Sequence, residues 1–324
     1  MQLALAIGIF IIGIVFIVKG GDWFVDSATW MARAAKIPTF IVGATIVSFA
    51  TTLPELIVSL IASVENKNDM AIGNAVGSVI ANTGLIMAIA FTFISISTPR
   101  KNYWPQCLLL LGSATVLWLG CLSGAMSLWA SIILLLICVM FMVLNIVQGR
   151  RAVATTTTDV TTAAPSETII INKKTIAKNI VLFLVGAAGV IVGSNFLING
   201  GSTMAEFLHI PERLVAITLV AVGTSLPELV TTVTAIRKKE GGLSVGNIIG
   251  ANIIDLTLIL PICSFVAHDS FTVSAQYLMI DFPFCLAFSL LALVPLLGKQ
   301  RSYRWQGILM LLGYLAYVIV SAVL

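Results

Sequence analysis

The chain has 324 residues, of which 59% are hydrophobic and only 10% are charged, against roughly 45–50% and about 25% in soluble domains. Its formal net charge of +4 is too small an excess to indicate a nucleic-acid-binding surface. The two histidines and five cysteines show neither a zinc-ligand spacing nor a protease motif. The composition therefore excludes a water-soluble protein and most enzymes, and it indicates no cofactor.

Long apolar runs follow one another along the whole chain. The first run has no basic segment before it and ends at Lys19 rather than at a small-residue cleavage site, so we interpret it as a retained span. About 20 apolar residues cross a bilayer, and division at the charged and Gly/Pro-rich breaks gives ten spans. The predicted spans are 3–18, 38–63, 70–96, 105–122, 127–147, 176–199, 211–236, 242–267, 273–297 and 303–323.

One long polar, threonine-rich segment, 149–175, separates five spans from five. It is too short to hold a regulatory domain, so we expect a first five-helix repeat at 1–148, a linker, and a second repeat at 176–324. With the N-terminus placed outside, sixteen of the eighteen Lys and Arg fall on the linker's side, and only Lys67 and Arg213 fall opposite. The positive-inside rule then predicts a multi-pass protein of the cell membrane with both termini outside and the linker cytoplasmic.

The two halves repeat at an offset of 173 residues without a gap. This offset carries Leu53-Pro54-Glu55-Leu56 onto Leu226-Pro227-Glu228-Leu229, and Gly73-Asn74 onto Gly246-Asn247. An odd number of spans, five, separates the copies, so the second copy enters the membrane from the opposite side. The sequence therefore predicts an all-α membrane protein with ten transmembrane helices in two inverted-topology repeats, an architecture typical of secondary transporters.

Three carboxyl groups fall well inside predicted spans, away from the span ends, those of Glu55, Glu228 and Asp255. An acidic residue at the centre of a span costs about 2.5–3.5 kcal/mol on insertion scales. No Lys or Arg is expected at their depth, so a bound cation is the simplest compensation. Protonated carboxyls that hydrogen-bond between helices are the alternative explanation.

A proline precedes each glutamate. Pro54 and Pro227 remove a backbone donor and disfavour helix in the preceding residue, so we expect each helix to break one or two residues before its glutamate and to free carbonyl oxygens. Oxygen ligands without nitrogen are typical of sites for hard cations such as Ca²⁺ and Na⁺. The predicted neutral ligands are the carbonyls of Ser48, Thr51, Ala221 and Thr224, the hydroxyls of Thr51, Thr52, Thr224, Ser225 and Ser78, and the amide of Asn82. The glycines expected to let the two hairpins pack closely are Gly73, Gly77, Gly246 and Gly250.

The stretches Thr51-Thr52-Leu53-Pro54-Glu55 and Gly223-Thr224-Ser225-Leu226-Pro227-Glu228, each followed by a Gly-Asn-x-x-Gly helix, resemble the two α-repeats of the sodium/calcium exchanger family, within the cation/Ca²⁺ antiporter superfamily. The resemblance implies that Glu55 and Glu228 coordinate Ca²⁺ and share in binding Na⁺. The residues that it implies complete the overlapping sites are Thr51, Thr52, Thr224, Ser225, Ser48, Ala221, Ser78, Asn82 and Asp255.

The chain departs from the family pattern at three positions. Ala50 replaces the motif glycine, and Val79 replaces a frequent asparagine. Ala251 stands where a hydroxyl residue is usual, opposite Ser78 in the other repeat. This last change removes an oxygen from what the family pattern would make a Na⁺ ligand.

These patterns predict a secondary antiporter, not an enzyme, that exchanges Ca²⁺ for Na⁺ by alternating access, with the lipid bilayer around it and no obligate protein partner. A Ca²⁺/H⁺ antiporter of the same fold is the alternative, although the intramembrane hydroxyls favour Na⁺ because a proton needs only the carboxyls. A cation channel is a further alternative, while an intramembrane protease lacks its paired-aspartate or Ser/His motif. We expect structural or interfacial roles for Asp22 and Asp26, in the first cytoplasmic loop, and for Asp281 in the ninth span.

Overall fold

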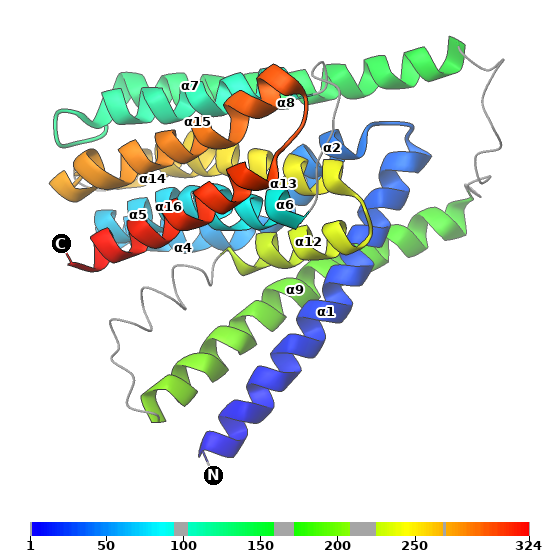
Figure 1. Cartoon of the computed structure of the whole chain (residues 1–324), viewed down its shortest axis with the longest axis horizontal. Coiled ribbons are helices and arrows are strands. Elements are labelled where there is room, and N and C mark those ends of the chain that lie inside the picture. Colours follow the sequence, from blue (N-terminus) through cyan, green and yellow to red (C-terminus); the bar gives the residue numbers. More distant parts are fainter. Residues whose placement is uncertain (1, 94–102, 159–171, 208–224, 268–269, 324) are drawn as a thin grey trace.

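The computed structural model describes residues 2–93, 103–158, 172–207, 225–267 and 270–323. These residues are almost entirely helical (Figure 1), and an isolated β-bridge joins Ala125 to Thr272. Within this part of the chain, eight helices are long and apolar enough to cross a membrane, and a bent helix pair makes a ninth candidate. The remaining predicted span, 211–236, lies partly outside the described residues.

The two longest helices, α1 (Gln2–Ala34) and α9 (Lys173–Phe207), pack against each other and lean away from the rest of the molecule (Figure 1). Glycines bring their backbones together: a Cβ on Gly186 would lie 2.7 Å from the Phe24 nitrogen, and one on Gly193 would lie 2.9 Å from the Gly13 carbonyl oxygen. Small residues at such crossings are typical of membrane helix pairs.

The prediction that Asp22 and Asp26 lie in a loop is wrong, because α1 remains helical to Ala34. A long-range ion-pair cluster holds this part of the helix. The Lys238 ammonium lies 2.8 Å from Asp26 Oδ1 and 3.4 Å from Asp22 Oδ1. This cluster ties α1 to the end of α12 and gives both aspartates a structural role.

The other helices of the first half lie beside and above this pair in Figure 1. The helix α8 continues to Thr158, well into the segment predicted as a linker. The bounds are α2 (Thr39–Val42), η1 (Gly43–Val47), α3 (Ser48–Thr51), α4 (Leu53–Val64), α5 (Asn68–Ala81), η2 (Asn82–Met87), α6 (Ala88–Phe93), α7 (Trp104–Cys121) and α8 (Leu128–Thr158), where η marks a π-helix.

In the second half, α13 is the central helix, and every residue from Leu243 to Ile254 is buried. Helices on the outside, such as α16, expose apolar side chains, among them Leu312 and Leu315, as lipid-facing helices do. The bounds are α12 (Leu226–Arg237), α13 (Gly241–Ile254), η5 (Asp255–Ile259), α14 (Leu260–Val266), η6 (Tyr277–Asp281), α15 (Phe282–Lys299) and α16 (Arg304–Val323).

Candidate cation site

Both glutamates lie just after a helix start. In the first half, the segments 39–51 and 53–64 are bent by 45° at Thr52, whose backbone angles are φ −85° and ψ −2°. In the second half, α12 begins directly after Ser225, at φ −86° and ψ 7°. These matching angles lie in the sparsely occupied bridge region. The break predicted before each glutamate is therefore present at Thr52, three residues before Glu55 and one residue earlier than expected.

The break does not free the Ser48 carbonyl, contrary to expectation. That oxygen accepts hydrogen bonds from the Thr52 amide at 2.9 Å and from the Thr52 hydroxyl at 2.5 Å. The Thr51 hydroxyl donates to it as well, at 3.3 Å. The carbonyl that loses its donor is that of Ala50, because Pro54, four residues later, has no amide hydrogen.

The three intramembrane carboxyl groups come together in the centre of the protein. Glu55, Glu228 and Asp255 are each only 1% exposed, and the charges of Glu228 and Asp255 both act on Glu55. All four glutamate oxygens and Asp255 Oδ1 have no hydrogen-bond partner among the described residues. Buried carboxylates without donors are strongly unfavourable unless a cation or proton joins them.

A protein cation does not provide this compensation in the part of the chain that the structure describes, where every buried residue is neutral or acidic. Within the same residues, no group of three or more His, Cys, Asp or Glu side chains is arranged closely enough to hold a metal ion alone. Neutral oxygens would therefore have to complete the coordination of an ion held between the carboxylates.

Hydroxyl groups of the expected kind surround the glutamates. Thr51, from the first half, lies beside Glu228 of the second half, and its hydroxyl donates to Asn247 Oδ1 at 3.2 Å. The Ser225 hydroxyl is fully buried and has no partner among the described residues. Ser78 is buried as well. Ala221 and Thr224 lie outside the described residues.

Asn82 and Asp255, which the offset of 173 relates, each begin a π-helix, η2 and η5. Such helices are rare and occur frequently at functional sites. Asn82 Nδ2 donates to Asn252 Oδ1 at 3.0 Å. The Asn82 amide oxygen is buried without a partner in the described part of the chain. It is thus an oxygen still available to a ligand.

Close helix crossing brings the two halves of this site together. A Cβ on Gly250 would lie 2.6 Å from both the Ala44 carbonyl oxygen and Ser48 Oγ, and one on Gly246 would collide with the Phe40 carbonyl. These two glycines therefore allow α13 to contact α2, η1 and α3, as predicted.

The structure does not test the corresponding prediction for the glycines of the first half, because the offset of 173 relates their expected contacts to positions 213, 217 and 221, which lie outside the described residues. Among the described residues, a Cβ on Gly77 would meet no atom within 4 Å, and one on Gly73 would lie 2.7 Å from the Tyr277 hydroxyl.

Three asparagines near the site were not assigned a role from the sequence. Asn247 accepts from Thr51, Asn252 accepts from Asn82, and Asn74 donates to the Glu55 carbonyl at 3.0 Å. The Gly-Asn pair repeated in both halves was an available signal for Asn74 and Asn247, and it does not include Asn252. Asp281, outside the hairpins, accepts a 2.5 Å hydrogen bond from the Tyr317 hydroxyl, which gives it a structural contact.

Membrane-spanning helices in two repeats, each with a buried glutamate just after a helix start, define a secondary cation transporter rather than an enzyme. The model of the sodium/calcium exchanger protein family matches residues 5–147 and 178–323 of this chain. The protein therefore belongs to the sodium/calcium exchanger family.

Relatives match over almost the whole chain. It is 29% identical to the sodium/calcium exchanger MaX1 of Methanosarcina acetivorans, covering 96% of this chain and 97% of that one. It is also 29% identical to the inner membrane protein YrbG of Escherichia coli, with 97% and 96% covered. A solved structure of the sodium-calcium exchanger NCX_Mj superposes with a TM-score of 0.81 at 28% identity, covering 98% of this chain and 99% of that one. The fold predicted from the sequence, a ten-helix inverted repeat, is thus confirmed.

Proposed function

We propose that this protein exchanges Ca²⁺ for Na⁺ across the cell membrane by alternating access to one site between Glu55 and Glu228. The observation that carries the proposal is the pair of repeat-related, buried glutamates whose four oxygens have no partner among the described residues. Their two negative charges balance one Ca²⁺ or two Na⁺. The similarity to MaX1 and NCX_Mj, both sodium/calcium exchangers, supports the choice of ions.

The proposed ligands are, with one exception, those expected from the sequence, and they fall into charged carboxylates and neutral oxygens. The carboxylates attract the cation electrostatically. Hydroxyl, amide and carbonyl oxygens complete an oxygen coordination shell of the kind that hard cations prefer. The proposed set is Glu55, Glu228, Asp255, Asn82, Thr51, Thr52, Thr224, Ser225, Ser78 and Ala221. Ser48 is left out of it, because its carbonyl already accepts hydrogen bonds from Thr51 and Thr52.

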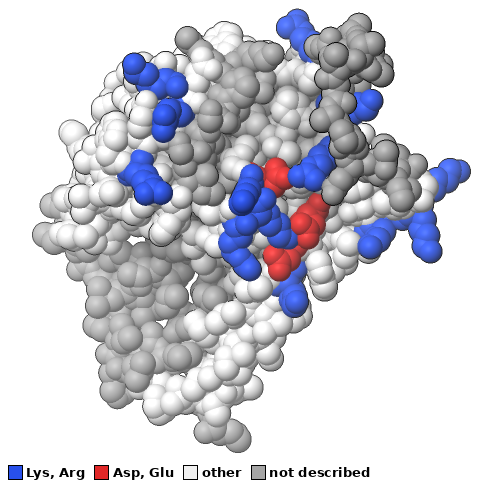
Figure 2. Space-filling model, turned by 45° about the vertical axis from the view of Figure 1, so that its right-hand side comes forward, with Lys and Arg blue, Asp and Glu red and all other residues white. Residues whose placement is uncertain are grey.

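We also propose that the linker faces the cytoplasm and both termini face outside. Figure 2 shows Lys and Arg side chains gathered on the face where the ends of α8 and α9 lead to the linker. Exposed residues on that side include Arg33, Lys36, Arg237 and Lys239, whereas Lys67 lies in the α4–α5 turn, which is placed outside. This asymmetry is the one that sets orientation in membrane proteins.

Transport by the purified protein tests the exchange directly. Proteoliposomes loaded with Na⁺ and diluted into Na⁺-free buffer containing ⁴⁵Ca²⁺ should accumulate Ca²⁺, and liposomes without a Na⁺ gradient should not. The same liposomes with an imposed pH gradient and no Na⁺ provide the comparison. Uptake driven by Na⁺ but not by the pH gradient supports the proposal.

Two results would contradict the proposal of Na⁺/Ca²⁺ exchange and favour another function. Uptake driven by the pH gradient alone would identify Ca²⁺/H⁺ exchange. Uptake that needs no counter-ion and does not saturate with Ca²⁺ would identify a channel, since a channel opens both sides at once. Glu228→Gln protein, reconstituted at equal density, is the negative control, because it removes one charge of the proposed site and retains the side-chain volume.

A further inference from the structure

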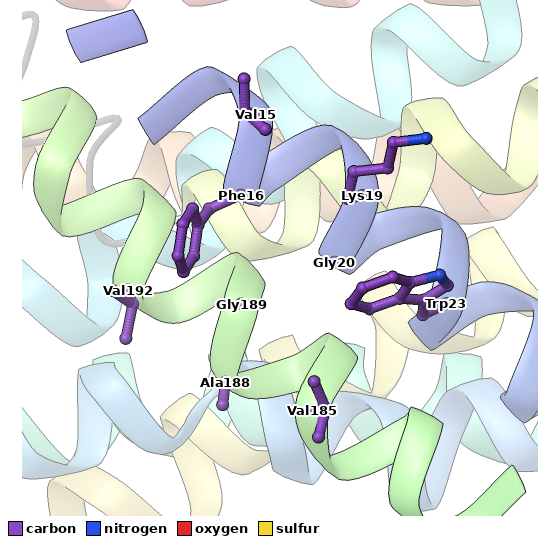
Figure 3. Close-up of a pocket in the computed structure, with 9 residues that line it drawn as sticks. All are labelled: Val15, Phe16, Lys19, Gly20, Trp23, Val185, Ala188, Gly189 and Val192. Atoms are coloured by element: carbon purple, nitrogen blue, oxygen red, sulfur yellow. The ribbon is translucent and has the colours of Figure 1, made fainter. Parts of the chain in front are cut away.

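A groove of about 390 Å³ runs along the outer side of the α1 and α9 pair (Figure 3). Its floor is backbone, because the Cβ that Gly189 lacks would lie 3.3 Å from the Gly20 Cα. Apolar side chains such as Phe16 and Val192 form its walls, and Lys19 is its single charged lining residue. We propose that this groove binds one anionic glycerophospholipid, with an acyl chain along the floor and the phosphate at the Lys19 ammonium.

The charge of Lys19 points to an anion. Lys19 is exposed and forms no ion pair within the described residues. The nearest acidic residues along α1, Asp22 and Asp26, are paired with Lys238 instead. A ligand that approaches the groove therefore meets a positive charge that no protein carboxylate neutralises.

The depth of Lys19 matches that of a lipid phosphate. The apolar run that starts at Leu3 stops at Lys19, and a rise of 1.5 Å per residue places them about 24 Å apart, close to the roughly 30 Å hydrocarbon thickness. Figure 3 shows Trp23 at the same end of the groove as Lys19, with Phe16 and Val192 at the other end. Trp and Lys together are typical of the membrane interface, so the apolar end faces the acyl chains and the charged end faces the headgroups.

The leaflet follows from the direction of α1. Beyond Lys19 the helix leads to the ion pairs with Lys238 and to Arg33, one of the basic residues that the proposed orientation places on the linker side. The lipid is therefore taken from the leaflet on the linker side. This inference depends on membrane insertion of the α1 and α9 pair and not on which ions are transported.

Lipid retention measures this binding. The protein is reconstituted into vesicles of equal phosphatidylglycerol and phosphatidylcholine with identical acyl chains, extracted in mild detergent, and weighed by native mass spectrometry. We expect one retained phosphatidylglycerol per protein. Lys19→Gln should reduce that retention about fivefold, because one basic residue near the surface contributes that much to anionic-lipid binding. Lys178→Gln, at an exposed lysine on α9 outside the groove, should leave it unchanged.

A second variant tests the groove rather than the charge. Ala188 is exposed and lines the groove, so Ala188→Phe should fill it and abolish retention. Ala316→Phe, at an exposed position on α16, is the matched control. Equal retention of the two lipids by the unmodified protein, equal effects of the two lysine substitutions, or full retention in Ala188→Phe would overturn the proposal.

Discussion

Two glycines that the internal repeat relates, Gly77 and Gly250, should respond in opposite ways to alanine. A Cβ at Gly250 would lie 2.6 Å from Ala44 O and 2.6 Å from Ser48 Oγ, and the carbonyl belongs to a packed helix that can yield only by moving. Overpacking of this kind costs about 1–3 kcal/mol. Among the described residues, a Cβ at Gly77 meets no atom within 4 Å, so Gly77→Ala should raise stability by roughly 0.5–1 kcal/mol through helix propensity.

Gly250→Ala should also affect Ca²⁺ binding, because the helix that has to move carries residues of the candidate site. Relief of the clash at Gly250 pushes α3, which carries Ser48 and Thr51, away from α13, and stretches the Thr51–Asn247 hydrogen bond of 3.2 Å. We therefore expect Gly250→Ala to weaken apparent Ca²⁺ affinity as well as stability. Gly77→Ala should leave Ca²⁺ affinity at the wild-type value.

Thermal melting of the two purified variants in the same detergent measures the stability difference, and ⁴⁵Ca²⁺ uptake at increasing Ca²⁺ concentration measures affinity. The melting temperature of Gly250→Ala should lie below wild type, and that of Gly77→Ala should lie at or above it. Equal melting temperatures for the two variants would refute the crossing geometry, since identical substitutions at repeat-related positions would then meet identical surroundings.

Three further predictions concern the site and the topology. Glu55→Gln and Glu228→Gln should each abolish Ca²⁺ transport while the protein elutes and melts as a folded species, and wild-type transport by either would remove that glutamate from the mechanism. Cysteines introduced at positions 160 and 208 of a cysteine-free variant should react with impermeant reagents from opposite sides of the membrane, and same-side labelling would contradict the inverted repeat. Ala251→Ser, which restores a hydroxyl at a fully buried position of α13, should lower the Na⁺ concentration for half-maximal exchange with little change in Ca²⁺ affinity, and an unchanged Na⁺ dependence would show that position 251 does not face a Na⁺ site.

Much of the fold could be predicted because its determinants are local. Bilayer thickness sets the length of an apolar run, and proline interrupts a helix wherever it occurs, so the bend before Glu55 follows from Pro54 alone. The repeated Leu-Pro-Glu-Leu could be recognised without any contact information. Since both copies carry a glutamate, the convergence of Glu55 and Glu228 followed from the repeat.

The incorrect predictions concern features that depend on distant residues. The part of α1 beyond Lys19 is paired with Lys238, more than two hundred residues away in the sequence. The hydrogen bond that Thr51 donates to Asn247 likewise joins the two halves. The π-helices that begin at Asn82 and Asp255 have no sequence signature that we could have used, because the shift in backbone pairing depends on packing against neighbouring helices.

The two halves share a backbone plan but not a chemical environment, and the differences lie around the cation site. Asn82 and Asp255 occupy the same position at the start of a π-helix, yet only one of them has a carboxylate, so two of the three carboxyl groups of the candidate site come from the second half. That half lacks the hydroxyl that Ser78 supplies in the first, because Ala251 takes its place. In the proposed exchange Glu55 and Glu228 together balance one Ca²⁺ or two Na⁺, so we expect the charge of Asp255 to decide whether a third Na⁺ binds. Two identical halves would contribute equal numbers of carboxyl groups, so their site could not hold three.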